Sequence, residues 1–358
     1  MEFTTLTPEE FSEYAEKSPY KSFMQTPEIA QYRESNGWTP YYLGVKKHDE
    51  LLAACLLVAK PTFLGKSTFL APGGPLFDLE NTALTNFFFK KLKQFVKSHN
   101  GYTLHISPYY EYVERDRDGE KVAGGFYHKK ARQNLLNLGF KPLKHSSVPT
   151  YQFVMDINGR TKDEIFADFK RNTRNHIRKA EKQGVTIREL KRDELKHLKT
   201  ITDKTAHRRD FTDQPLSYYE SMYDLLTPRN AVKFLLAEAN IDGKQTDLSA
   251  AMFITYGDEV VYLFSGSDEA YMRDYNAQYL IQWYMIQHAV DHNFKKYNFY
   301  GINELPNRDS KDYGIYDFKK GFGGHVVELI GSYELPVNQA FYTLYNLLAK
   351  FKNLFHHA

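Results

Sequence analysis

Residues Tyr297–Pro336 read YNFYGINELPNRDSKDYGIYDFKKGFGGHVVELIGSYELP, and the rest of the chain is interpreted around this stretch. The aromatic run 297–300 is typical of a buried strand, and a polar segment that includes Asn303 and Pro306 follows it. Two lysines then precede the glycine-rich run 321–324, where glycine permits close approach to a ligand or positive φ. We predict a loop at a strand edge whose lysine handles negative charge. A turn with solvated lysines is the alternative.

A second stretch, Phe169–Val185, reads FKRNTRNHIRKAEKQGV. Small or apolar residues recur at spacings of three and four along 161–183, which predicts one amphipathic helix. The basic side chains that could contact phosphates on it are Lys170, Arg171, Arg174, Arg178 and Lys179. A helix face that only meets water is the alternative interpretation.

These two stretches resemble motifs of the Fem aminoacyltransferases. The resemblance is carried by FKRNTRNHIRKAEKQGV and by GIYDFKKGFGG followed by ELIGSYELPVN, in the same order and at a plausible distance. It implies transfer of an amino acid from aminoacyl-tRNA to the lysine side chain of the peptidoglycan stem peptide. The acceptor would be UDP-MurNAc-pentapeptide or lipid II, and the product would be the interpeptide bridge.

The order of predicted elements repeats along the chain. Each half contains a strand pair, a glycine turn, a helix and further strands, which favours a duplicated unit of mixed sheet with helical cover. We predict an α/β (α+β) fold of two tandem GNAT-like domains. The first comprises residues 1–149 and 335–358, and the second comprises residues 150–334. Ala239–Ser249 reads as a short loop, where some Fem members carry a coiled-coil arm.

Bulk composition limits the classes of function. The 358 residues carry a net charge of +3, so a nucleic-acid contact requires a local basic patch. The single cysteine, Cys55, excludes a disulfide within the chain and favours a reducing compartment. No signal peptide or apolar stretch of about 20 residues is apparent, which predicts a cytoplasmic protein. This leaves room for a peripheral contact with the membrane surface.

The resemblance implies catalytic roles for Lys319 and Phe318. Lys319 would be the cation near the transferring ester, and Phe318 would stack on the substrate or shape the pocket. Lys320 is the adjacent alternative to Lys319. No general base is evident in the sequence, so a substrate phosphate or the terminal adenosine could serve.

Further residues are expected to hold the substrate. Arg208 or Arg209 would hold the diphosphate of the precursor, because the arginine fork suits paired phosphate oxygens. Arg33, which follows Gln25, stands where the family often has lysine. The remaining candidates are aromatic or hydroxyl side chains, each with a packing role as the alternative: Tyr109, Tyr219, Tyr262 and Ser265.

Two other functions compete with the aminoacyltransferase. One is a CoA-dependent N-acyltransferase on the GNAT fold, but residues 273–278 lack the first glycine of a pyrophosphate loop. The other is an RNA-binding module without catalysis. The aminoacyl ester is already activated, so no cofactor and no metal are expected. The amino acid transferred could be alanine, serine or glycine, and DNA is not expected as a partner.

Overall fold

A computed structural model describes residues 1–144, 148–302, 304–305, 307–310 and 312–356. Asn303 and Pro306, expected in the polar segment, lie outside the described residues. The chain divides into two compact units. Unit 1 is Met1–Glu114, Gly124–Thr150 and Glu328–Ala358, and unit 2 is Arg115–Ala123 and Tyr151–Val327. The sequence placed the boundaries after residues 149 and 334.

Unit 1 is built on a seven-stranded sheet with the order β1-β2-β3-β4-β5-β15-β7. Its elements are β1 (Glu2–Thr5), α1 (Pro8–Lys17), α2 (Pro27–Ser35), β2 (Thr39–Lys47), β3 (Glu50–Pro61), the 3-10 turn η1 (Phe63–Gly65), β4 (Ser67–Gly73), α3 (Thr82–Ser98), β5 (Gly101–Pro108), β6 (Glu111–Glu114), α4 (Lys129–Asn137), β7 (Lys141–Pro142), β15 (Tyr333–Pro336) and α12 (Gln339–His356).

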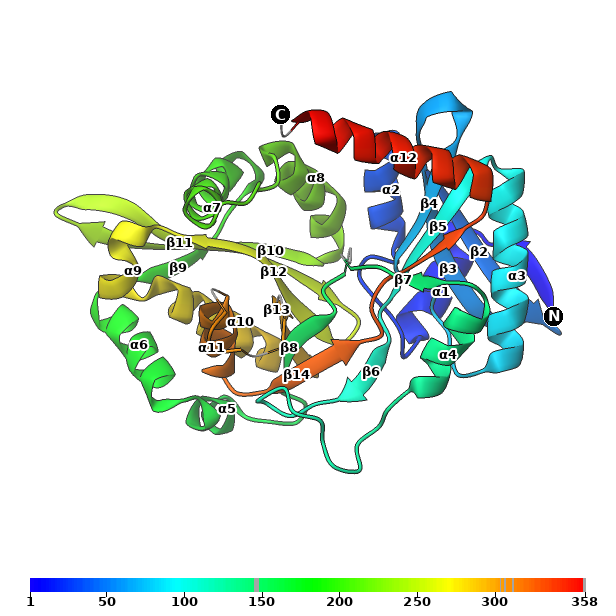
Figure 1. The fold of residues 1–358 in the computed structure, drawn as a ribbon. Coiled ribbons are helices and arrows are strands. Elements are labelled where there is room, and N and C mark those ends of the chain that lie inside the picture. The colour runs from blue at the N-terminus through cyan, green and yellow to red at the C-terminus, as the bar shows by residue number, and fades with distance from the viewer. Residues whose placement is uncertain (145–147, 303, 306, 311, 357–358) are drawn as a thin grey trace. The chain divides into compact units, whose positions relative to one another are not determined.

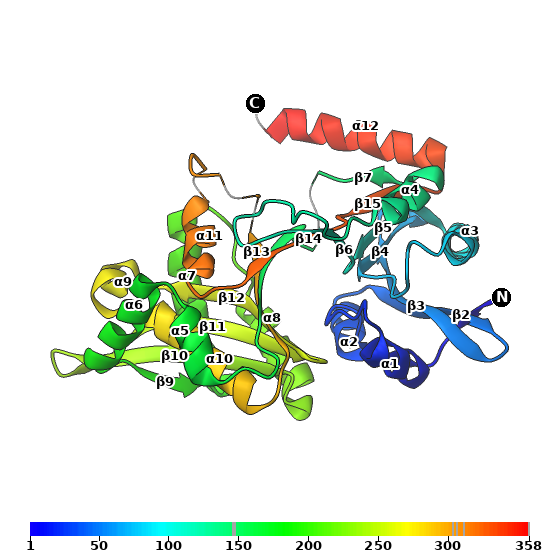
Figure 2. The same cartoon turned by 90° about the horizontal axis from the view of Figure 1, so that it is seen from below.

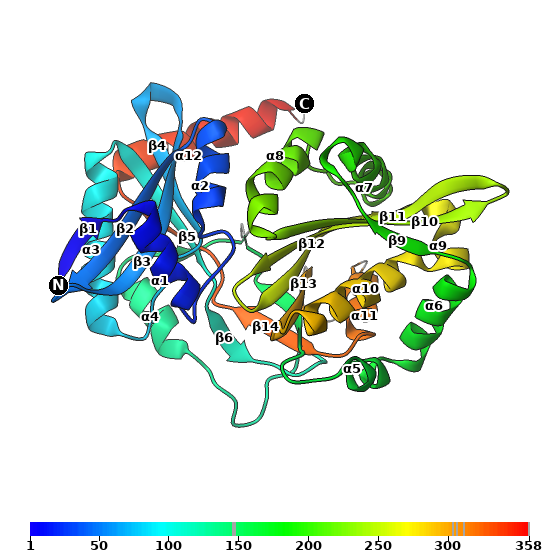
Figure 3. The same ribbon diagram turned by 180° about the vertical axis from the view of Figure 1, so that it is seen from behind.

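The alternation of side chains along β3 gives this sheet two buried faces. Ala53, Cys55 and Leu57 belong to the core beneath α3 and α4. Ala54 and Leu56 belong to the smaller core beneath α1 and α2. Figure 3 shows α1 and α2 in front of this sheet. Cys55 is buried with a free thiol, and burial raises its pKa.

Unit 2 is built on a second mixed sheet, whose strands run β14-β8-β13-β12-β11-β10-β9. Its elements are β8 (Tyr151–Asp156), α5 (Lys162–Asp168), α6 (Arg171–Lys182), β9 (Thr186–Glu189), the 3-10 turn η2 (Arg192–Glu194), α7 (Leu195–Arg209), α8 (Leu216–Leu226), the 3-10 turn η3 (Thr227–Arg229), β10 (Val232–Ile241), β11 (Lys244–Tyr256), β12 (Glu259–Ser267), α9 (Glu269–Tyr275), α10 (Ala277–Asp291), β13 (Lys296–Ile302), α11 (Tyr313–Lys320) and β14 (His325–Leu329), which crosses the unit boundary.

The two units repeat one topology. In unit 1, β2, β3 and β4 are antiparallel neighbours, and α3 leads to β5, which pairs parallel with β4. In unit 2, β10, β11 and β12 are antiparallel neighbours, and α10 leads to β13, which pairs parallel with β12. Figure 1 shows α7 and α8 on one face of the second sheet and α6 and α10 on the other. The predicted mixed α/β fold is confirmed.

Two helical segments of unit 2 are interrupted in the structure. The helix expected over 161–183 is two helices, because Phe169 and Lys170 are extended between α5 and α6. This break lets the Phe169 ring pack against Trp283, with ring centroids 5.5 Å apart. The helical segment that follows β12 is also divided, into α9 and α10, at Asn276, whose φ is 52°.

The short loop expected at Ala239–Ser249 is instead the end of a long β-hairpin. Strand β10 continues to Ile241 and β11 begins at Lys244, so only Asp242 and Gly243 make the turn. Both turn residues have positive φ, as a two-residue hairpin turn requires. No coiled-coil arm interrupts this fully described segment. None of the described helices is both long and apolar enough to cross a membrane.

Candidate functional site

Lys319 lies in the last turn of α11, and its side chain is buried rather than placed in a loop as the sequence suggested. Only 6 % of the residue is exposed. Its Nζ donates to the carbonyl oxygen of Gly301 at 2.5 Å and to that of Tyr300 at 3.3 Å. Figure 2 shows α11 beside β13, the strand that carries both carbonyls. The amine of Lys319 on helix α11 therefore contacts the end of the buried strand β13.

An irregularity in β13 turns these carbonyls toward Lys319. The pairing with β8 shifts register between Asn298 and Gly301, as in a β-bulge. Tyr300 has a φ of 62°, which is a strained value for an aromatic residue. Its N–H donates to Oδ1 of buried Asn298 at 2.7 Å. Asn298 Nδ2 in turn donates to the side-chain oxygens of Gln152 and Glu259, at 2.7 and 2.9 Å.

The glycines after Lys319 serve packing within unit 2. A Cβ added at Gly321 would lie 2.4 Å from Thr173 Oγ1 on α6. A Cβ added at Gly324, whose φ is 97°, would lie 2.3 Å from the Val154 carbonyl oxygen on β8. These glycines allow α6 and β8 to approach the turn after α11. The sequence suggested that these glycines let the backbone approach a ligand. In the structure, Gly321 and Gly324 instead let the backbone approach Thr173 and Val154.

Burial determines the proton affinity of Lys319. It lowers the pKa of the ammonium to about 7, because the charged form loses its hydration. The two acceptors are neutral carbonyl groups, so they do not supply the charge of a carboxylate. Lys319 can therefore gain or lose a proton near neutral pH, which is unusual for lysine and typical of catalytic sites.

Lys320 has a different environment. Its ammonium forms an ion pair with Asp118 and lies 5.4 Å from the centre of the Tyr316 ring. Burial acts to lower the pKa of Lys320, but the hydrogen bonds to Asp118 and Tyr316 outweigh it and raise that pKa. The same ion pair lowers the pKa of Asp118. Lys320 therefore links α11 to segment 115–123 through its ion pair. Its neighbour Lys319 is the lysine whose pKa lies near neutral pH.

Phe318 is part of an aromatic cluster beside Lys319. Its ring centroid lies 4.9 Å from that of Tyr279 and 5.3 Å from that of Phe322, both in edge-to-face geometry. The ring is half-buried. Phe318 thus shapes the wall next to the amine and keeps part of its surface accessible.

Strand β12 supplies a second set of groups. Its parallel pairing with β13 ends at Val261 and Asn298, so the following residues lie where the two strands separate. There the Tyr262 hydroxyl donates to Ser265 Oγ at 2.5 Å. Burial raises the pKa of Tyr262 to about 12, while the bond with Ser265 and the charge of Arg209 act in the opposite direction. The positive charge of Arg209 therefore acts on the pair formed by Tyr262 and Ser265.

The remaining candidates, Arg208, Arg209 and Tyr219, lie around α7 in different environments. Arg208 donates to the Met272 sulfur at 3.0 Å, whereas the Arg209 side chain is exposed. Tyr219 is fully buried, and its hydroxyl donates to Asp213 at 2.8 Å. Arg209 is thus better placed than Arg208 to meet a solvated anion. Tyr219 fixes the segment after α7 rather than facing solvent.

The basic residues of α6 are partly engaged inside unit 2. Arg174 Nη1 donates to the carbonyls of Ala167 and Phe169, at 2.6 and 2.5 Å. These bonds satisfy carbonyl groups at the C-terminal end of α5. The other contacts join Lys170 Nζ to Asp317 at 2.8 Å, Lys179 Nζ to the Arg273 carbonyl at 2.9 Å, and the Arg178 guanidinium to the Phe166 ring at 5.4 Å. Arg171 is exposed at the first position of the helix.

Arg33 and Tyr109 are the candidates that lie in unit 1. The Arg33 guanidinium lies 4.6 Å from the centre of the Trp38 ring. Gln25 is buried and bonds through its side chain to Leu56 N and O, at 2.7 and 3.0 Å, so its role is structural. Tyr109 follows the end of β5 and is half-buried. Nearby Ser107 meets Ser332 with an Oγ–Oγ distance of 2.5 Å.

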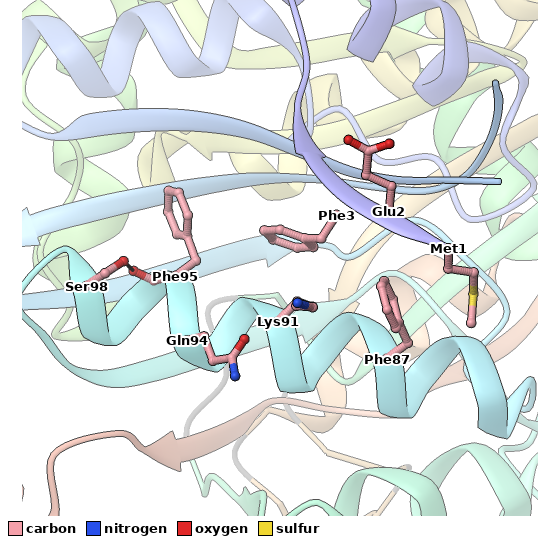
Figure 4. Close-up of a pocket in the computed structure, with 8 residues that line it drawn as sticks. All are labelled: Met1, Glu2, Phe3, Phe87, Lys91, Gln94, Phe95 and Ser98. Carbon is pink, nitrogen blue, oxygen red and sulfur yellow. Dashed lines mark hydrogen bonds between the residues drawn. The ribbon is translucent and has the colours of Figure 1, made fainter. Parts of the chain in front are cut away.

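A hollow on unit 1 contains none of the residues that the sequence singled out. It lies between β1 and α3, and Figure 4 shows the side chains that line it. These are Met1, Glu2, Phe3, Phe87, Lys91, Gln94, Phe95 and Ser98. Because none of the candidate residues lines this hollow, the candidate site is the surroundings of Lys319 in unit 2.

The duplicated topology is a tandem GNAT-like fold. A solved tandem GNAT protein from the clavulanic acid biosynthesis pathway has a TM-score of 0.54 at 11 % identity, over 94 % of this chain and 98 % of that one. The crystal structure of FemX has a TM-score of 0.81 at 22 % identity, over 96 % of this chain and 99 % of that one.

The FemAB family model matches residues 6–248 and 239–350, and the chain belongs to the FemAB family. Two curated relatives are the aminoacyltransferases FemA of Staphylococcus aureus strains bovine RF122 / ET3-1 and MRSA252. Each is 28 % identical to this chain, and each alignment covers 99 % of both proteins.

Proposed function

We propose that this FemAB-family protein is a non-ribosomal aminoacyltransferase that builds the interpeptide bridge of peptidoglycan. It would move an amino acid from aminoacyl-tRNA to the ε-amino group of the stem-peptide lysine, in the cytoplasm. Support comes from the relatives named aminoacyltransferase and from the buried amine of Lys319. The observation that carries the proposal is the short contact of Lys319 Nζ with the Gly301 carbonyl.

The reaction needs charge stabilisation and alignment rather than activation. The neutral acceptor amine attacks the ester carbonyl carbon, a C–N bond forms, and the C–O bond to the ribose breaks. Lys319 as an ammonium would donate to the oxyanion, a type of contact that typically contributes about 10²–10³ in rate. Because its pKa is about 7, it could also give its proton to the departing ribose oxygen. The proton that the acceptor nitrogen loses would pass to the Lys319 amine and restore its ammonium form.

Two regions would hold the substrates. Arg209 of unit 2, whose charge acts on Tyr262, would meet the diphosphate of the precursor. In unit 1, taken by itself, Arg33 and Tyr109 stay candidate substrate-binding residues. The exposed side of α6 would meet tRNA phosphates. Arg174 and Lys179 already bond to helix-end carbonyls, so tRNA would have to share or displace these contacts.

A CoA-dependent N-acyltransferase is the second candidate, favoured only by the GNAT-like fold. Its pyrophosphate would need free N–H groups at the start of α10. At that point Asn276 is 4 % exposed and bonds through Nδ2 to the Arg273 carbonyl at 3.2 Å. A non-glycine, packed residue at this position argues against a glycine-rich phosphate loop.

The test is transfer with defined substrates. The protein is incubated with tRNA charged with alanine, serine or glycine and with UDP-MurNAc-pentapeptide or lipid II, and the acceptor mass is measured. A mass increase equal to one residue supports the proposal and identifies the amino acid. No increase with any pair, together with tight acetyl-CoA binding by calorimetry, would overturn it.

A further inference from the structure

Helix α11 takes part in two ion pairs on one face. Asp317 Oδ1 lies 2.8 Å from Nζ of Lys170, the residue that precedes α6. Lys320, three residues after Asp317, forms the ion pair with Asp118. Side chains three positions apart lie on the same side of a helix, so the two ion pairs are neighbours. The exposed Arg171 follows Lys170 in the chain and adds a third cation to this surface of unit 2.

The carboxylates are the more exposed partners of these two ion pairs. The Asp118 side chain is 58 % exposed, whereas that of Lys320 is 16 % exposed. The Asp317 side chain is 55 % exposed, and that of Lys170 is 41 % exposed. Exposed ion pairs contribute little to stability, so another anion can replace the carboxylate at a small cost in free energy. An anion in the place of either carboxylate would contact the ammonium group behind it.

The turn that carries Asp118 is held by bonds other than its ion pair. Segment 115–123 packs in unit 2, although the residues on both sides of it belong to unit 1. The hydroxyl of Tyr316 on α11 donates to the carbonyl of Arg117 at 2.7 Å. Within the turn, the Asp116 carboxylate accepts from the N–H of Asp118 at 2.8 Å. Loss of the Asp118 carboxylate would therefore leave this turn in place beside α11.

We propose that Lys320 and Lys170 bind phosphates of the tRNA backbone. In the free protein, Asp118 and Asp317 occupy the two phosphate positions. A backbone phosphate displaces each carboxylate, because both groups offer charged oxygen acceptors to the same lysine. Several separate cations on one surface suit a chain of phosphates better than one small anion. The inference rests on the proposed function, and it makes Asp118 a residue that lowers the affinity for RNA.

Filter binding of uncharged tRNA to the full chain at several salt concentrations tests this inference. We expect Asp118→Asn to tighten binding about two- to fivefold, because phosphate no longer has to displace an exposed ion pair. The slope of log affinity against log salt should steepen by up to about one, since Asp118 no longer neutralises Lys320. Inorganic phosphate at the same ionic strength should not compete with tRNA.

A matched control separates this local effect from net charge. Asp291 is 52 % exposed, and its carboxylate lies 2.7 Å from Lys162 Nζ in the same unit. Asp291→Asn therefore removes one negative charge from a comparable ion pair, and it should leave tRNA affinity and salt slope near those of the natural chain. In a Lys320→Gln background, Asp118→Asn should no longer tighten binding.

Unchanged or weaker tRNA binding by Asp118→Asn would overturn the inference, as would an equal gain from Asp291→Asn. A gain that persists in the Lys320→Gln background, or competition by inorganic phosphate, would also overturn it. The transfer assay is read separately. Tighter tRNA binding by Asp118→Asn without transfer to any acceptor would contradict the proposed function and leave the phosphate positions standing. Transfer by the natural chain, with a tRNA affinity that Asp118→Asn does not change, would overturn the phosphate positions alone.

Discussion

The amine of Lys319 lies 2.5 Å from the carbonyl oxygen of Gly301, and this contact joins α11 to the irregular end of β13. The contact depends on Tyr300, whose positive φ is held by the side chain of Asn298. Strain of this kind persists only where surrounding bonds determine it, and it is common at functional sites. We therefore regard Asn298 as a positioning residue for Lys319.

Replacement of Asn298 tests this role. Asn298→Ala removes the acceptor for the Tyr300 N–H and the Nδ2 group that donates to Gln152 and Glu259, at a cost of about 1–3 kcal/mol in stability. We expect kcat to fall at least tenfold and its pH profile to shift, because the carbonyls no longer face Lys319. A stable, folded variant whose pH profile is unchanged would contradict the positioning role.

The pH dependence of stability tests the burial of Lys319. Its folded-state pKa of about 7 lies below the ordinary value of 10.5, so between these values the unfolded chain binds more protons. The free energy of unfolding therefore rises with pH through this group. Lys319→Met removes this contribution, so the stability of the variant relative to the natural chain should decrease by roughly 2 kcal/mol from pH 7 to pH 9. Urea unfolding at each pH measures this difference in the free energy of unfolding. A difference that does not change with pH would mean that the Lys319 side chain is solvated.

Close packing at Gly321 makes a separate prediction. Gly321→Ala places a Cβ against Thr173 Oγ1, so we expect a loss of about 1–3 kcal/mol in the free energy of unfolding. The double variant Gly321→Ala/Thr173→Ala should recover much of this loss. Gly314→Ala in the same helix meets no atom within 4 Å and serves as the control. Equal effects of the two single alanine substitutions would show that α6 does not constrain this turn.

The exposed arginine of α6 tests the tRNA contact. Arg171→Glu should weaken binding of tRNA and reduce the slope of log affinity against log salt by about one, as expected for a lost phosphate contact. Arg192→Glu, which replaces an arginine paired with Asp224 in η2, is the control. Filter binding at several salt concentrations measures both, and an unchanged slope for Arg171→Glu would exclude this helix from the interface.

The sequence predicted most of the fold because periodicity and turn residues are local signals. The strand pairs and the repeated order of elements followed from them. The break at Phe169 was missed, because it depends on packing that an amphipathic pattern does not contain. The Fem motif drew attention to Lys319 but suggested a loop, whereas the residue ends a helix.

The supporting residues of the site were not predictable from one sequence. Asn298 and Gln152 lie 146 positions apart, and Lys320 and Asp118 lie 202 apart, so no local pattern links them. The positive φ of Tyr300 also has no signal, because aromatic residues rarely adopt it. The basic residues of α6 were visible, but their bonds to the helix-end carbonyls required the fold.

Single-turnover transfer of a labelled amino acid from charged tRNA tests the central claim most directly. Lys319→Met is compared with Lys320→Met, which removes the neighbouring amine and its ion pair with Asp118. We expect Lys319→Met to lose about 10²–10³ in rate while it still binds the precursor, and Lys320→Met to lose far less. Undiminished transfer by Lys319→Met would contradict the account.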